Sequence, residues 1–386
     1  MSKTNPTSAD KEVVGPLYHA LVLIATAVFL FAATFFGLPA FFSISYSEMN
    51  ATSTSPGGVH ASAYILDKRA YDEKLLALAH VATSSPWYYA FLNGTTTVTL
   101  PGATTTVSVA KKSWPTVQPY PKDNRALLPF NRIVAYYGNF YSKYMGVLGE
   151  YPEDVMLEKL KGAVAQWEAA DPATPVIPAI HYIAIVAQAD GGKDGKYRAV
   201  MPDDQIDHAL ELAKKVDGVV FIDLQVGLSN VETELPKFKK YIALPNVHVG
   251  LDPEFAMESS GVKPGRVIGT LDAKNINFAI NYISQIVEEN NLPPKVLMIH
   301  RFTQDMVTNY KQIKPTPEVQ VVMDMDGWGS PQRKKNTYAH VVVSQPIQFT
   351  GFKLFYKNDL KEDPPRMLTP KEVIDLTPSP VYIQYQ

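Results

Sequence analysis

The stretch NVHVGLDPEF (246–255) has the pattern that decides the fold, an alternating apolar run that ends in acidic residues. Segments of this kind occur eight times: RIVAYYGN (132–139), PVIPAIHY (175–182), GVVFIDLQ (218–225), NVHVGLDPEF (246–255), KVLMIHRF (295–302), VQVVMDMDGW (319–328), TGFKLFYK (350–357) and PVYIQYQ (380–386). Most are separated by stretches with helical spacing, such as 152–170 and 275–291. Strands that alternate with helices predict parallel βαβ units. Eight units predict an α/β protein with a (β/α)₈ TIM barrel over 132–386 that lacks a clear final helix.

The alternation also predicts which side chains point into the barrel. Successive side chains of a strand point to opposite faces. In 246–255 the face that suits packing under helices holds Val247, Val249 and Leu251. The other face, directed inward, holds His248, Gly250, Asp252 and Glu254. Because the carboxyl ends of barrel strands build the active site, we expect the chemistry at these ends.

Acidic side chains at the strand ends favour carboxylate chemistry. Glycoside hydrolysis needs two carboxyl groups beside the scissile bond. We expect Glu254 as the general acid, with Asp252 and Asp324 as further catalytic carboxylates. Aromatic rings beside carboxylates suit a sugar, so the other strand-end groups are expected to bind the substrate. They are Tyr137, His181, Asp223, Gln225, His300, Arg301, Asp326, Trp328, Lys353 and Tyr382.

Two other functions stay open at the level of sequence. The barrel mouth of a non-catalytic module would bind a carbohydrate or another envelope component, with its carboxylates neutralised by Lys353 or Arg301. A metal-dependent hydrolase would use His181, His300 and carboxylates as ligands. The sequence contains no cysteine and no H-x-H or H-E-x-x-H pattern. We therefore expect no metal and no cofactor.

The residues before the barrel predict an attachment to a membrane. Residues 17–44 carry no formal charge apart from any proton on His19, and this stretch exceeds the roughly 20 residues that span a bilayer. We expect a cytoplasmic segment (1–16), a single transmembrane anchor (17–44), and a Thr/Ser/Pro-rich stalk and strap (45–131). Lys3 and Lys11 on the N-terminal flank favour an N-terminus inside and an extracytoplasmic barrel.

The overall charge bears on the partners. The net charge of the 386-residue chain is −2, with both signs mixed along the sequence. Nucleic-acid binding requires a basic surface, so this composition predicts no nucleic-acid partner. The expected partners are the membrane and a glycan or other cell-envelope component.

The strand motifs resemble those of a bacterial family. RIVAYYGN, PAIHYIAIVAQ, FIDLQVG, NVHVGLDPEF, VVMDMDGWG and PVYIQYQ are similar to motifs of membrane-anchored or secreted TIM-barrel proteins of uncharacterised activity. This resemblance covers roughly 132–386 and implies a barrel that faces the cell exterior. Asp252-Pro253-Glu254 also resembles the final D-x-E of the strand-four motif in family 18 chitinases, although Gly250 stands where that motif has its middle Asp.

Overall fold

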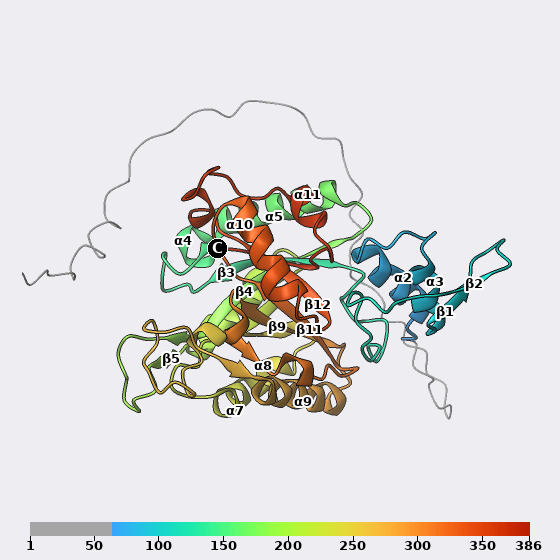
Figure 1. Ribbon diagram of the computed structural model, residues 1–386. Coiled ribbons are helices and arrows are strands. Elements are labelled where there is room, and N and C mark those ends of the chain that lie inside the picture. The colour runs from blue at the N-terminus through green and yellow to red at the C-terminus, as the bar shows by residue number, and fades with distance from the viewer. Residues whose placement is uncertain (1–63) are drawn as a thin grey trace, which may run out of the picture. The chain divides into compact units, whose positions relative to one another are not determined.

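The computed structural model describes residues 64–386 (Figure 1). The expected cytoplasmic segment (1–16) and transmembrane anchor (17–44) lie outside the described residues, as does the first part of the expected stalk. Between residues 64 and 386, no helix combines the length and the apolar character that a bilayer crossing requires.

Eight parallel strands form a closed barrel. They are β3 (Arg132–Gly138), β4 (Val176–Ala187), β6 (Val219–Leu224), β7 (Val247–Leu251), β9 (Lys295–Arg301), β11 (Val319–Met325), β12 (Phe349–Leu354) and β13 (Tyr382–Tyr385). Each strand pairs with the next one in the sequence, and β3 pairs with both β4 and β13, which closes the ring. All eight predicted strands are present, so the predicted eight-stranded (β/α)₈ barrel is confirmed.

Helices cover the outside of the barrel. They are α4 (Val147–Glu150), α5 (Glu153–Ala170), α6 (Asp203–Lys214), α7 (Val231–Glu234), α8 (Lys239–Ile242), α9 (Ala273–Glu289), α10 (Pro331–Thr337) and α11 (Pro370–Ile374). Figure 1 shows α5 and α11 on one side of the strands and α7, α8 and α9 on the other. Between β9 and β11 the chain forms two 3₁₀ turns, η3 (Gln304–Met306) and η4 (Tyr310–Gln312), and the two-residue strand β10 (Val307–Thr308), so this βα unit lacks an α-helix.

The barrel has an outer and an inner apolar layer. The outward faces of the strands pack under the helices, as Val247, Val249 and Leu251 do on β7. The inner layer at the amino ends of the strands includes Phe221 and Met298. This division follows from the alternation of side chains along each strand, and it leaves polar side chains at the carboxyl ends.

The segment before the barrel covers the amino ends of the strands through its helix α2 (Lys68–Leu78) and its irregular strap (114–131). It also contains α3 (Pro86–Asn93) and the hairpin of β1 (Thr97–Thr99) and β2 (Thr106–Ser108). Leu128 of the strap belongs to the inner apolar layer. The backbone N–H of Leu128 donates to Gln320 Oε1 over 3.1 Å, and Gln320 Nε2 donates to the Leu128 carbonyl over 2.6 Å. The strap thus closes the end of the barrel opposite the polar side chains.

Candidate functional site

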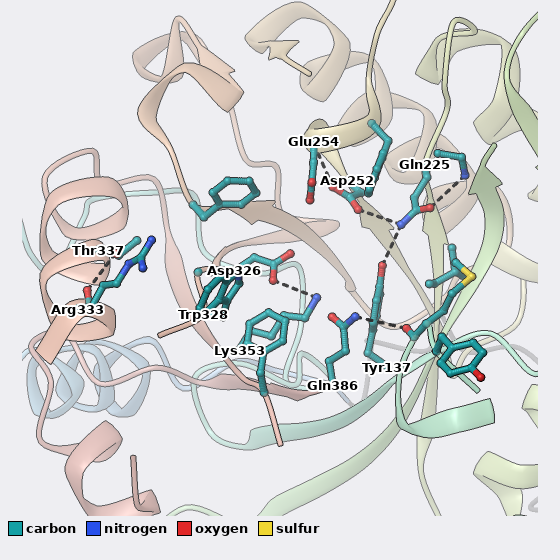
Figure 2. Close-up of a pocket in the computed structure, with 18 residues that line it drawn as sticks. Tyr137, Gln225, Asp252, Glu254, Asp326, Trp328, Arg333, Thr337, Lys353 and Gln386 are labelled. Carbon is teal, nitrogen blue, oxygen red and sulfur yellow. Dashed lines mark hydrogen bonds and ion pairs between the residues drawn. The ribbon is translucent and has the colours of Figure 1, made fainter. Parts of the chain in front are cut away.

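A cavity of about 460 Å³ opens at the carboxyl ends of the strands. Its volume lies in the usual range of small-molecule sites. The wall is made by Tyr137, Tyr144, Met145, Ile183, Ala187, Gln225, Asp252, Glu254, Phe255, Phe302, Asp326, Gly327, Trp328, Arg333, Thr337, Lys353, Phe355 and Gln386. Figure 2 shows these side chains around the cavity, with charged and aromatic groups interspersed.

One carboxyl pair follows β7 in a short 3₁₀ turn, η2 (Pro253–Phe255). Asp252 caps this turn, because its Oδ1 accepts a hydrogen bond from the Glu254 backbone N–H over 3.1 Å. Gln225 Nε2 donates to the other oxygen of Asp252 over 3.1 Å. Asp252 is therefore held at both oxygens. No hydrogen bond or ion pair within residues 64–386 engages the Glu254 carboxylate, which faces the cavity.

A second carboxyl group comes from the loop after β11. Asp326 Oδ1 lies 3.0 Å from Lys353 Nζ, and its Oδ2 lies 3.0 Å from His300 Nδ1. The Lys353 ammonium also lies 4.0 Å from the centre of the Tyr137 ring, at cation–π distance. Figure 2 shows the Asp326–Lys353 pair and the Asp252–Glu254 turn in the same cavity.

The cavity carboxyl groups have pKa values shifted in opposite directions. Burial, followed by the charge of Asp326, raises the pKa of Glu254 to about 6. Burial also raises the pKa of Asp252 to about 8. For Asp326 burial acts in the same direction, but Lys353 and His300 outweigh it and lower the pKa of Asp326 below its usual value. Near neutral pH the site therefore holds an ionised Asp326 beside carboxyl groups that retain protons more readily.

A second group of polar side chains lies outside the cavity wall. His181, Asp223, His300 and Asp324 are fully buried and do not line the cavity. Asp223 Oδ1 lies 3.4 Å from His181 Nε2 and 3.5 Å from His300 Nε2. Asp223 is linked to the cavity through Tyr137, whose hydroxyl donates to Asp223 Oδ2 over 3.1 Å.

Burial sets the direction of the pKa shift for Asp324 and His181, whereas neighbouring charges set it for His300 and Asp223. It raises the pKa of Asp324 to about 7 and lowers the pKa of His181 to about 4. Burial alone would also lower the pKa of His300, but the charges of Asp223 and Asp326 raise it well above its ordinary value. For Asp223 burial is outweighed by His300 and His181, which lower its pKa.

Two glycines make room for these buried groups. A Cβ on Gly250 of β7 would lie 2.4 Å from Asp223 Oδ1 and 2.7 Å from His181 Nε2. A Cβ on Gly351 of β12 would lie 2.5 Å from Asp324 Oδ1. Gly250 occupies the position of the middle Asp in the chitinase-like motif, and the space left by its missing side chain is used by the neighbouring strands.

The structure divides the predicted site residues into three groups. Those that line the cavity are Tyr137, Gln225, Asp252, Glu254, Asp326, Trp328 and Lys353. Those that lie outside its wall, inside the barrel, are His181, Asp223, His300, Asp324 and Tyr382. Arg301 points elsewhere, because its guanidinium donates to the carbonyls of Thr303, Gln304 and Val307 in the loop that follows β9.

Several wall residues were not predicted from the sequence. Tyr144 and Met145 belong to a loop, and Arg333 belongs to α10, so no strand periodicity marks them. Phe355 follows Lys353 by two residues, and a continued alternation along β12 would have identified it. Arg333 stacks its guanidinium over the Trp328 ring with 5.3 Å between the guanidinium carbon and the ring centre.

Comparisons with known proteins place no family name on the chain. No family model and no curated protein matches it. Among solved structures, it is similar to a tri-modular GH5 (subfamily 4) endo-β-1,4-glucanase from Bacillus licheniformis complexed with cellotetraose, with 9% identity and a TM-score of 0.38. That match covers 68% of this chain and 55% of the glucanase, so the chain spans little more than half of that protein's length.

A second similar structure is a ruminal GH26 endo-β-1,4-mannanase, with 11% identity, a TM-score of 0.36 and coverage of 72% of this chain and 66% of the mannanase. A third is a GH5 xyloglucan-specific endo-β-1,4-glucanase from a metagenomic library, with 13% identity, a TM-score of 0.31 and coverage of 59% and 77%. The barrel assignment rests on the strand pairing of this chain and not on these distant structural similarities.

Proposed function

We propose that the chain is a glycoside-hydrolase-like enzyme in which Glu254 is the general acid and Asp326 is the ionised carboxylate. The observation that supports this proposal is the cavity-facing Glu254 carboxyl, which has no polar partner among residues 64–386 and whose pKa is raised to about 6 in a cavity where Asp326 has a lowered pKa. When the environments of two carboxyl groups shift their pKa values in opposite directions, one group can act as the acid and the other as the base. Glycoside hydrolysis uses such a pair, with one group protonated and the other ionised.

The remaining cavity wall suits a sugar. Trp328 is 41% exposed, and Phe255, Phe302 and Tyr144 add further ring surface beside the carboxyl groups. Sugar rings present C–H faces to aromatic side chains and hydroxyl groups to polar ones. Gln225 lies on the wall with its amide between Asp252 and Tyr137, where it holds both groups in place. Asp252 thus acts as a positioning residue for the turn that carries Glu254.

A second candidate is a non-catalytic carbohydrate-binding module. It is favoured by the ion pair of Asp326 with Lys353, which reduces the basicity and nucleophilicity of Asp326. In a hydrolase, Lys353 would keep Asp326 ionised, whereas in a binding module the pair would only hold the shape of the wall. The two functions differ in turnover and not in ligand affinity.

The deciding experiment measures hydrolysis and binding in parallel. The purified chain is tested on soluble β-glucan, mannan, chitin oligosaccharides and peptidoglycan, with product detection by reducing ends and binding by calorimetry. Turnover that is lost in both Glu254→Gln and Asp326→Asn supports the hydrolase. Saturable binding to one glycan without turnover supports the module. Neither binding nor turnover on any of these glycans would contradict both.

We also propose that residues 17–44 anchor the barrel to a membrane so that it faces cell-envelope glycans. The support is the uncharged length of this stretch and the two lysines before it. Full-length chain expressed in bacteria is expected in the membrane fraction after carbonate washing, and protease added to spheroplasts should degrade the barrel. A full-length chain that stays in the supernatant would contradict the anchor.

A further inference from the structure

Three donor atoms converge inside the barrel at the carboxyl ends of three different strands. His181 Nε2 from β4, Asp223 Oδ1 from β6 and His300 Nε2 from β9 all lie within 4.8 Å of one another. All three residues are completely buried. None of the three atoms has a hydrogen-bond partner among residues 64–386. Buried polar atoms are almost always satisfied, so this cluster calls for a ligand or an explanation.

Two of the three distances among the donor atoms match the edges of a tetrahedral metal site, and the third, between the two histidine nitrogens, is within 4.8 Å. Asp223 Oδ1 lies 3.4 Å from His181 Nε2 and 3.5 Å from His300 Nε2. For metal–ligand bonds of about 2.0–2.2 Å, neighbouring corners of a tetrahedron lie about 3.3–3.6 Å apart. Two histidines and one carboxylate are a donor set that zinc and similar first-row ions accept.

The opposite side of each donor group is held by a second contact. His181 Nδ1 forms a 2.6 Å hydrogen bond with the Tyr382 hydroxyl, whereas His300 Nδ1 lies 3.0 Å from Asp326 Oδ2 at ion-pair distance without hydrogen-bond geometry. Tyr137 donates its hydroxyl to the other oxygen of Asp223. Metal-binding histidines regularly donate their second ring N–H to an oxygen, which fixes the tautomer and turns the free nitrogen toward the ion.

We propose that His181, Asp223 and His300 bind one divalent transition-metal ion of the zinc class. A further ligand, such as water, would complete the four-coordinate set. None of the three residues lines the cavity, so the ion would act on the cavity only through Tyr137 and Asp326. This inference is independent of the proposed hydrolysis.

The test measures metal binding directly, on the chain without a polyhistidine tag. After chelation and dialysis, the protein is titrated with Co²⁺ and followed by its visible absorption, which is intense for tetrahedral Co²⁺, and then with Zn²⁺ in competition. We expect one ion per chain. Zn²⁺ in excess over its Kd should also raise Tm, because the ion binds the folded chain in preference to the unfolded one.

Variants identify the ligands. His181→Gln and His300→Gln should each weaken Co²⁺ affinity by at least about 100-fold, and Asp326→Asn by about 10–100-fold, as is typical when a partner of a ligand is lost. The matched control is His248→Gln, because His248 is also a buried, inward-facing histidine, but its Nδ1 accepts the Val296 N–H. This control should retain the ion. Circular dichroism checks that each variant is folded.

The Co²⁺ titration of the wild-type chain tests whether a metal ion binds, even if the ligand variants do not fold. The absence of a saturable, tetrahedral Co²⁺ spectrum in the wild type would overturn the proposal, as would equal affinity in folded His181→Gln and His300→Gln. The cluster would then be an ion pair of Asp223 with the flanking histidines. Metal binding without glycan turnover, or turnover without metal binding, separates this proposal from the proposed function.

Discussion

Replacement of Glu254 by Gln tests the proposed general acid. The change keeps the size of the side chain and removes its titratable proton. The pKa of Glu254 is raised from 4.5 to about 6. At pH 7 roughly a tenth of the chains would then carry the proton, against roughly 0.3% for an unshifted Glu, a gain of about 30-fold in the active form. Loss of a general acid typically costs about 10²–10⁴ in rate.

The expected result is a fall of about 10²–10⁴ in kcat/KM on the glycan that the wild type hydrolyses. A general acid works while protonated, so the wild-type kcat/KM should decline as pH rises above about 6, and this limb should disappear in Glu254→Gln. The assay is reducing-end release between pH 4 and 9. Glu258→Gln is the matched control, since Glu258 is exposed four residues further on and lies outside the cavity wall. A Glu254→Gln enzyme within a few-fold of the wild type, or one that keeps the limb near pH 6, would rule out Glu254 as the general acid.

Three further predictions concern stability and are measured by denaturant unfolding. Gln320→Ala removes both hydrogen bonds to the backbone of Leu128 in the strap, and should lower the free energy of unfolding by about 2–4 kcal/mol. An unchanged denaturation midpoint would contradict the role of the Gln320 amide in holding the strap. Gly351→Ala places a methyl group 2.5 Å from a carboxylate oxygen of Asp324, and should cost about 1–3 kcal/mol. Lys334→Met removes the cation that lies 2.6 Å from the fully buried Asp359, and should cost about 3–5 kcal/mol; a loss below 1 kcal/mol would show that this carboxylate is otherwise satisfied.

The strands could be predicted from the sequence because each one combines an apolar run with a polar end. The alternation also identified inward positions such as Asp252 and Glu254, since side-chain direction has a fixed period of two along a strand. The pattern does not predict how far along the barrel axis each residue lies, because this position depends on the register between strands. Asp324 and Asp326 share a face, yet only Asp326 reaches the cavity wall.

The sequence placed His181, Asp223 and His300 among the strand-end groups and left a metal site with His181, His300 and carboxylates open as an alternative. It favoured no metal, because the three residues come from separate strands and no short ligand spacing links them. Loop residues of the cavity wall such as Tyr144 were not predicted for a related reason, because loops have no periodic sequence pattern.

The closure of the barrel through β13 has a consequence for biosynthesis. β13 follows the other seven barrel strands in the sequence and provides the only link between β12 and β3 in the ring of residues 132–386. During translation both β3 and β12 therefore keep an unpaired hydrogen-bonding edge until residues 382–385 have left the ribosome. Open edges of this kind attract other strands and promote aggregation. We therefore expect ribosome-stalled chains that lack β13 to be retained by chaperones more strongly than the completed barrel.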